Sequence, residues 1–217
     1  MKGFFITSNN TGVGKTHIGA RIIKSLKTDI DLSVRKPVES DCKDINGDLF
    51  PSDANKLYEA SGRNENIDTV CRFKFEMCAS PRLAAKDAKT SLTIQDLFEA
   101  CQTDKEFIIV EGAGGILSPI AEDGLNVDLI SKLGLPVIIV VNDELGAINQ
   151  ALLTINAAEQ RRIKIMCVIL NQITEERETS LNNKSELQEF TRHPVLKYNE
   201  NKIESFIDQL KKLINNS

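Results

Sequence analysis

Glycines, a lysine and a threonine lie close together near the start of the chain. Residues 7–17 read TSNNTGVGKTH and directly follow the apolar run of residues 4–6. Glycine lets a backbone approach a ligand closely, and backbone N–H groups at the start of a helix bind anions. A lysine and a threonine in this setting can hold phosphate oxygens and Mg²⁺. The pattern predicts a loop that binds the phosphates of a nucleotide through Gly12, Val13, Gly14, Lys15 and Thr16.

This loop departs from the common form at its first position. Asn9 stands where a glycine usually opens such a loop, and counting from Ser8 instead places five residues before Gly14. The alternative is an ordinary glycine-containing turn with Lys15 in solvent. An apolar strand before the loop and an amphipathic helix after it favour phosphate binding. His17 would then touch the nucleotide, although a solvated histidine on a helix face is the more ordinary interpretation.

Three further groups of polar residues follow predicted strands or begin a helix. Lys36 ends one strand and Glu111 another, and ligands of open α/β sheets bind beyond the carboxyl ends of the strands. Lys36 would therefore face the same crevice as Lys15. Asp53, at a helix start, and Glu111 can each supply carboxylate oxygens to Mg²⁺. The glycine-rich run after Glu111 can pass close to phosphate, and it comprises Gly112, Ala113 and Gly114.

Each of these groups also has a purely structural interpretation. Lys36 precedes a proline and suits a surface turn, Asp53 suits a helix cap, and residues 112–115 suit a glycine-rich turn. Asn171, with Gln172, ends another strand, where its amide can pair with a purine edge or cap a turn. His193 precedes a proline and is predicted to lie in a loop.

The residues around these groups alternate between strand and helix patterns. Apolar, β-rich runs predict strands at 3–7, 32–36, 107–111, 137–142 and 166–171. Several of them are continuously apolar, which suits parallel strands covered on both faces. Helical spacing predicts helices at 15–27, 53–60, 93–103, 126–133, 148–160 and 203–214. We expect an α/β three-layer sandwich, a mostly parallel central sheet with helices on both faces, as one domain over residues 1–217. The polar stretch 174–185 is predicted to be a mobile connection leading into a helix.

Composition narrows the possible partners. Lys and Arg total 27 against 31 Asp and Glu, which gives a net charge of −4 and no basic block for nucleic acid. The longest apolar run, 135–141, is too short to cross a membrane. Five cysteines without a paired pattern indicate reduced thiols. We therefore expect a cytoplasmic protein that binds neither nucleic acid nor membrane.

Taken together, the motifs resemble the dethiobiotin synthetase family, a group of P-loop enzymes. The matching stretches are TGVGKT (11–16), KPVES (36–40), SDA (52–54), VEGAGG (110–115), Ser118-Pro119, LPVIIVV (135–141) and LGAINQALLT (145–154). Their order and spacing agree over residues 3–172. The resemblance implies ATP- and Mg²⁺-dependent ring closure of 7,8-diaminopelargonic acid (7,8-diaminononanoate) with CO₂. This reaction passes through a carbamate and a carbamic-phosphoric anhydride, and gives dethiobiotin, ADP and phosphate.

The same resemblance assigns roles to individual residues. It implies that Lys36, Lys15 and Thr11 are catalytic and that Ser40 contacts the substrate. Mg²⁺ would be held by Thr16, Asp53 and Glu111. It also implies a homodimer in which the substrate of one subunit is contacted by Leu145, Gly146 and Asn149 of the other. For this last group the alternative is a helix start buried within one subunit.

The chain differs from the family pattern at several positions. Ser8 stands where the family usually has a glycine, Gly12 stands where it often has a Glu, and Gln172 stands where it commonly has an Asp. Residues 193–198 lack the usual Gly-x-x-Pro pattern, and we place a weaker adenine contact near residues 200–202. One rival class is the switch ATPases that position plasmids or division sites, but these usually carry a further lysine early in the loop. The amidation domain of cobyrinate-type synthetases is a second rival, but it is normally fused to a glutaminase.

Overall fold

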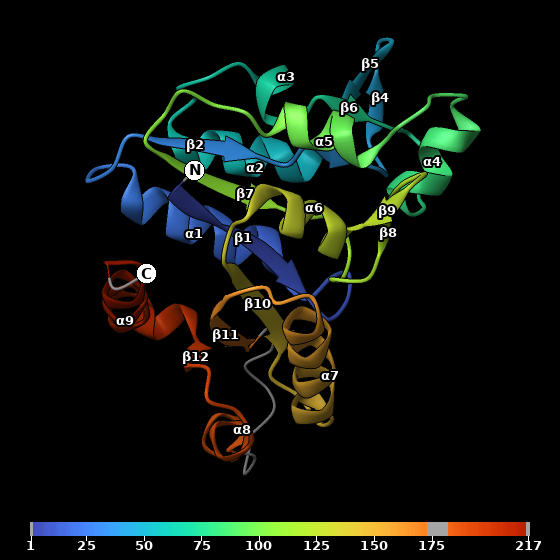
Figure 1. Ribbon diagram of the computed structural model, residues 1–217. Helices are drawn as coiled ribbons and strands as arrows, with labels where there is room; N and C mark the ends of the chain where they lie inside the picture. Colours follow the sequence, from blue (N-terminus) through green and yellow to red (C-terminus); the bar gives the residue numbers. More distant parts are fainter. Residues whose placement is uncertain (1, 173–181, 216–217) are drawn as a thin grey trace.

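A computed structural model describes residues 2–172 and 182–215. Its centre is a six-stranded sheet in the order β12-β11-β10-β1-β7-β2, and every neighbouring pair is parallel (Figure 1). The strands are β1 (Lys2–Ser8), β2 (Leu32–Arg35), β7 (Phe107–Glu111), β10 (Val137–Asn142), β11 (Ile165–Asn171) and β12 (Val195–Tyr198). The predicted parallel sheet is confirmed, and β2 ends one residue before Lys36.

Helices cover both faces of this sheet. Side chains alternate between the faces along a strand, so Phe4 and Phe5 of β1 enter two different apolar cores. The core around Phe4 receives side chains from α1 (Lys15–Leu26), α2 (Ser52–Ser61), α3 (Ile67–Val70) and α9 (Ile203–Asn215). The core around Phe5 receives them from α4 (Pro81–Asp87), α5 (Ile94–Ala100), α6 (Asn126–Leu133), α7 (Ala147–Gln160) and α8 (Asn183–Phe190). The expected three-layer α/β sandwich is confirmed.

Several short elements were not predicted from the sequence. They are the pairs β3 (Val38–Glu39) with β6 (Phe73–Lys74), β4 (Lys43–Ile45) with β5 (Asp48–Phe50) and β8 (Pro119–Ala121) with β9 (Gly124–Leu125), and the single 3₁₀ turn η1 (Glu200–Lys202). Strand β12 and helices α3 and α4 were also missed, because elements of four to seven residues carry little periodicity, and α8 was expected only as a helix without bounds after the polar stretch. The predicted helix at 93–103 is present as α5, and Thr93 with Asp96 forms a capping box at its start.

Two further expectations concern particular segments. Of the predicted connection 174–185, residues 174–181 lie outside the described part of the chain, and α8 begins at Asn183. Within the described residues, no helix has the length and apolar character needed to span a bilayer. His193 lies between α8 and β12, as the sequence predicts, and its ring Nε2 is 3.0 Å from Glu159 Oε1.

The parallel register places the residues that follow β2 beside the end of β7. Arg35 pairs with Val110, so Lys36 comes level with Glu111, and Ile6 of β1 pairs with Glu111 from the other side. The phosphate-binding loop, Lys36 and Glu111 therefore meet at the carboxyl ends of the neighbouring strands β1, β2 and β7.

Gly3 gives a test of the close contact between β1 and β7. It has φ +144°, and a Cβ at this position would lie 1.9 Å from the carbonyl oxygen of Ile108. We expect Gly3→Ala to lower the free energy of unfolding by about 3 kcal/mol through strain and overpacking, measured by urea denaturation followed by circular dichroism. The control is Gly47→Ala, because Gly47 also has positive φ (+92°) but open space around it. Equal losses in the two variants would contradict the predicted collision.

Candidate active site

The loop between β1 and α1 has the conformation expected of a phosphate cradle. Gly12 and Gly14 have φ of 76° and 88°, in the left-handed region that favours glycine. Gly14 is the N-cap residue of α1 and makes no side-chain cap bond, so the first N–H groups of the helix remain available to an anion. Ser8 Oγ donates to the carbonyl of Asn10 at 2.7 Å, which closes the loop on itself.

Asn171 of β11 holds this loop from the neighbouring part of the sheet. Its side-chain Nδ2 donates to the carbonyl oxygen of Val13 at 2.8 Å, and the residue is 4% exposed. A Cβ on Gly14 would lie 2.2 Å from the same nitrogen, so a larger residue at position 14 would break the contact. Asn171 thus fixes the loop, whatever contact it also makes with a nucleotide base.

Lys15 is buried against its own loop. Its Nζ donates to Ser8 Oγ at 2.9 Å and to the carbonyl of Asn10 at 3.2 Å. Burial, reinforced by the positive charge of Lys36, lowers the pKa of Lys15 to about 8. An anion bound beside Lys15 would therefore stabilise its charged ammonium form.

Glu111 is the buried acceptor at the centre of the site. Its Oε1 accepts hydrogen bonds from Thr16 Oγ1 and from Lys36 Nζ, each at 2.7 Å, and the Glu111 side chain is 1% exposed. Three elements meet here, because Thr16 belongs to α1, Glu111 to β7 and Lys36 to the segment after β2. The carboxylate therefore fixes where both the hydroxyl and the ammonium lie.

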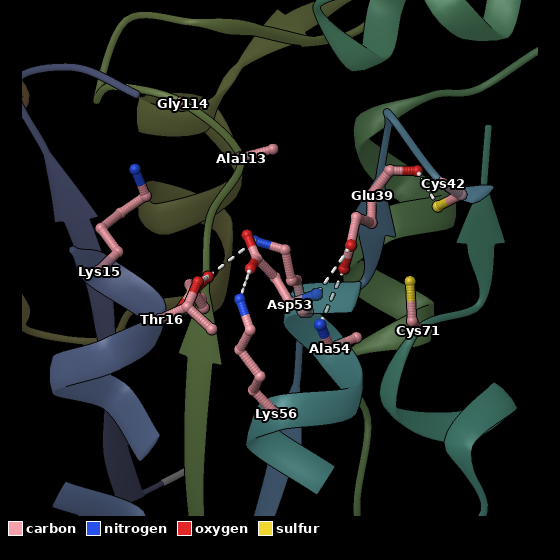
Figure 2. A network of polar contacts seen from close by, with 12 residues as sticks. Lys15, Thr16, Glu39, Cys42, Asp53, Ala54, Lys56, Cys71, Ala113 and Gly114 are labelled. Carbon is pink, nitrogen blue, oxygen red and sulfur yellow. Dashed lines mark hydrogen bonds and ion pairs between the residues drawn. The ribbon is translucent and has the colours of Figure 1, made fainter. Parts of the chain in front are cut away.

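Asp53 completes the charged cluster (Figure 2). Its Oδ2 lies 4.0 Å from Lys36 Nζ and its Oδ1 lies 3.0 Å from Lys56 Nζ. Burial raises its pKa, but the charge of Lys36 and the contacts with Lys56 and Thr16 outweigh this and hold the pKa below its usual value. Asp53 lies in the first turn of α2 and is not its N-cap residue, which is Pro51.

Lys36 contrasts with Lys15 in its surroundings. Burial alone would lower the pKa of Lys36, but the carboxylates of Glu111, Glu39 and Asp53 outweigh burial and raise it. Lys36 is therefore a permanent cation, held by protein carboxylates. Its side chain is 5% exposed, so it does not extend into bulk water.

The segment after Glu111 lies against the phosphate-binding loop. Ser8 Oγ is 3.2 Å from the carbonyl of Gly114, and the N–H of Ile116 donates to the carbonyl of Ser8 at 2.9 Å. Asn126 supports the segment from α6, since its Nδ2 donates to the carbonyls of Ala113 and Gly115 at 2.6 and 2.8 Å. The two glycine-containing segments therefore form one wall.

A cavity of about 420 Å³ lies between this wall and the segments that carry Lys36 and Asp53. Six of the residues that line it were predicted as site residues from the sequence: Thr11, Lys36, Ser40, Asp53, Ala113 and Gly114. The remaining lining residues were not predicted as site residues: Glu39, Asp41, Cys78, Ala79, Ser80, Pro81 and Ser118. Ser40 Oγ donates to the carbonyl of Ala79 at 2.6 Å, which joins two sides of the cavity.

The residues predicted to hold Mg²⁺ do come together. Mg²⁺ prefers oxygen ligands and usually keeps several waters or phosphate oxygens. Thr16, Asp53 and Glu111 offer a hydroxyl and two carboxylates, and Glu111 Oε2 is buried with no hydrogen-bond partner among the described residues. No group of three His, Cys, Asp or Glu in the described chain is placed to hold an ion by itself. The donors therefore fit an ion that is also bound by phosphate and water.

Other predicted residues lie outside this cavity. Leu145, Gly146 and Asn149 are exposed at the start of α7, and Leu145 is 81% exposed. His17 lies on the side of α1 that faces Tyr198 and Glu200, with its Nε2 at 3.0 and 3.1 Å from their oxygens. Gln172 Oε1 accepts from Asn199 Nδ2 at 3.2 Å, on the same side of the loop.

The chain is similar to known proteins over most of its length. A family model described as an AAA domain matches residues 2–206. The ATP-dependent dethiobiotin synthetases of Vesicomyosocius okutanii and Ruthia magnifica are each 46% identical over 214 residues. This covers 99% of the chain, and 97% and 99% of the two relatives. The corresponding protein of Clostridium botulinum strain Alaska E43 is 34% identical over 89% of the chain and 88% of its own length.

Solved structures with a similar fold are more distant in sequence. A ParA family ATPase from Chlorobium tepidum has a TM-score of 0.54 at 16% identity and covers 100% of this chain and 92% of its own. The septum site-determining protein MinD of Pyrococcus horikoshii has a TM-score of 0.51 at 15% identity, with 100% and 90% covered. These likenesses concern the fold alone. The identity to the three synthetases over nearly the whole chain shows that the protein belongs to the ATP-dependent dethiobiotin synthetase family.

Proposed function

We propose that this chain catalyses the ATP-dependent closure of a cyclic urea on 7,8-diaminopelargonic acid, with CO₂ as the carbon source. Family membership supports the overall reaction. The observation that carries the proposal is the position of Lys36, which is buried beside Glu111 and lines the same cavity as Thr11 of the phosphate-binding loop. In the proposal, Lys36 and Lys15 supply the positive charge that two reacting anions need.

The proposed chemistry has three steps. One amine of the substrate attacks CO₂, forms the first C–N bond and loses a proton, which gives a carbamate. A carbamate oxygen then attacks the γ-phosphorus of ATP, ADP leaves, and a carbamic-phosphoric anhydride results. The second amine attacks the carbon of this anhydride, the second C–N bond forms, and phosphate leaves with loss of a proton.

The cations oppose the repulsion between carbamate and triphosphate. Electrostatic stabilisation of developing charge is commonly the largest contribution to catalysis, and phosphoryl transfer depends mainly on positioning and charge. In our proposal Lys15 neutralises the phosphates, Lys36 holds the carbamate, and Thr11 and Ser40 orient it from opposite sides of the cavity. Thr16, Asp53 and Glu111 would hold Mg²⁺, which would neutralise charge on the phosphates.

The base of the nucleotide would lie on the α1 side of the loop. Asn171 ends β11 there and Gln172 follows it, His17 faces the same side, and η1 (Glu200–Lys202) follows β12. One N–H of Asn171 Nδ2 already donates to Val13, so a contact that Asn171 makes with a base would use its amide oxygen or its second N–H.

We further propose that residues 1–217 act as one domain in a cytoplasmic homodimer. The central sheet contains both β1 and β12, so early and late parts of the chain share the same core. Leu145, Gly146 and Asn149 are exposed at the start of α7, next to the exposed Leu153. An exposed apolar patch of this kind is typical of an interface, and across it these residues would reach the cavity of the second subunit.

The decisive experiment is ATP turnover with and without the diamino acid and bicarbonate. We expect phosphate release to require both, with formation of the cyclic product detected by mass spectrometry. Turnover that is indifferent to the diamino acid would favour a switch ATPase instead.

The two lysines should differ when each is replaced. Lys36→Ala should reduce ring closure by about a hundredfold or more, because it removes the charge that binds the carbamate, while leaving ADP affinity within about threefold. Lys15→Ala should reduce both. Calorimetric ADP titration and steady-state kinetics measure these effects. Full activity in Lys36→Ala would contradict the proposed carbamate contact.

Nucleotide affinity should depend on the protonation of Lys15. A lysine with a pKa of about 8 is largely neutral at pH 9, whereas bound phosphate favours the ammonium form. The affinity for a non-hydrolysable ATP analogue should therefore fall about fivefold between pH 8 and pH 9, with proton uptake on binding. Calorimetry in two buffers of different ionisation enthalpy measures both. Lys15→Arg is the control: its guanidinium stays charged, so the dependence should flatten. A flat profile in the unmodified protein would contradict the prediction.

A mixing experiment tests the shared site. In a mixed dimer of Lys36→Ala and Asn149→Ala subunits, one of the two sites has both native residues. If the variants are nearly inactive alone, random mixing should restore about a quarter of native activity. Activity equal to the mean of the separate variants would instead place Asn149 in the site of its own subunit.

A further inference from the structure

Glu39 lies in the cavity wall but belongs to none of the charged pairs at hydrogen-bond distance. Instead both of its oxygens contact the backbone at the start of α2 (Figure 2). Oε1 accepts from the N–H of Asp53 at 2.9 Å, and Oε2 accepts from the N–H of Ala54 at 2.8 Å. Glu39 is 6% exposed, so these are buried, charge-assisted hydrogen bonds.

Helix α2 has no side-chain cap of its own. Its N-cap residue is Pro51, which offers no side-chain acceptor, so the first N–H groups of the helix need a partner from elsewhere. Glu39 supplies it from 14 and 15 residues earlier in the chain. A cap from a neighbouring residue would stabilise the helix alone, whereas this one also ties α2 to the segment that begins with Lys36.

The hydrogen bonds of Glu39 act on Asp53, whose carboxylate is one of the proposed metal ligands. Glu39 holds the backbone nitrogen of Asp53, while the Asp53 side chain is 42% exposed and reaches Lys36 only at 4.0 Å. The shorter contact of the Asp53 carboxylate, at 3.0 Å, is with Lys56 of α2 itself, so Asp53 moves together with this helix. Its place beside Thr16 depends on where the first turn of α2 lies.

The same contacts commit the oxygens of Glu39 to α2. Each accepts a backbone N–H of the helix, and losing these bonds would leave two helix N–H groups without partners.

We propose that Glu39 is a positioning residue that fixes the carboxylate of Asp53 beside Thr16 and thereby sets the affinity of the site for a divalent cation. The inference rests on the metal-binding role of Asp53 in the proposed function. Glu39 would act through Asp53 and would touch neither the metal nor the substrate.

The test is binding of Mn²⁺ to the protein–ADP complex, followed by electron paramagnetic resonance, in Glu39→Gln. The amide keeps one acceptor but turns a donor toward a backbone N–H. We expect Mn²⁺ affinity to fall about tenfold, as for other residues that orient metal ligands, and metal-free ADP affinity to stay within about twofold. This readout needs neither the diamino acid nor CO₂, so it can succeed even if the proposed reaction is wrong.

A double-substitution cycle shows whether Glu39 acts through Asp53. Asp53→Asn should itself weaken Mn²⁺ binding, and adding Glu39→Gln to it should have little further effect, because the residue through which Glu39 acts has already lost its charge. Full additivity of the two losses would overturn the proposal, as would unchanged Mn²⁺ affinity in Glu39→Gln alone.

Pro51→Ser separates positioning from simple helix capping. Pro51 has the extended conformation of an N-cap residue (φ −84°, ψ 97°), so a serine there can accept the same N–H groups from within α2. In the Glu39→Gln background it should recover the thermal midpoint without recovering Mn²⁺ affinity, since the tie to β3 stays broken. Recovery of both would reduce Glu39 to a cap and refute the proposal. Should Glu39→Gln alone be too unstable to study, this double variant supplies the folded protein for the binding measurement.

Discussion

The rest of the site depends on the buried carboxylate of Glu111. It is almost fully enclosed, and one of its oxygens accepts from both Lys36 and Thr16. Removing one partner of a buried ion pair leaves an uncompensated charge and is destabilising by about 3–5 kcal/mol. The pair forms because β2 and β7 are parallel neighbours in a register that brings Lys36 level with Glu111. A shift in the register of β2 against β7 would therefore also separate Lys36 from Glu111.

The two lysines of the site occupy opposite electrostatic situations. Lys36 is surrounded by Glu111, Glu39 and Asp53, so the protein itself neutralises it. Lys15 lies among uncharged loop atoms, and burial together with Lys36 lowers its pKa to about 8. The folded chain thus contains one cation that is already neutralised and one that an incoming anion would stabilise. This asymmetry explains how a site can keep positive charge buried and still gain free energy when it binds phosphate.

The sequence predicted those features whose cause is local. Apolar, β-rich runs predicted five of the six sheet strands, and the glycines, Lys15 and Thr16 predicted the loop, because each signal lies within a few residues. Strand β12, with four residues, gave too short a pattern. Asn126 and Glu39 were missed as site residues because their partners are backbone groups in other elements. Asn171 shows the same limit, since the carbonyl it binds lies 158 residues away and no local pattern distinguishes a loop anchor from a base contact.

The cavity offers little for covalent catalysis by the protein. Cys78 is an exposed thiol in its wall, but the negative charge of Asp41 and a hydrogen bond with it raise the pKa of Cys78, so a thiolate is disfavoured. Ser40 donates its hydroxyl to a backbone carbonyl, and Ser118 accepts a backbone N–H at 2.8 Å. Neither serine is within hydrogen-bond distance of a base among the described residues. In the proposed reaction the nucleophiles come from the bound diamine and carbamate, and the protein would contribute charge and position.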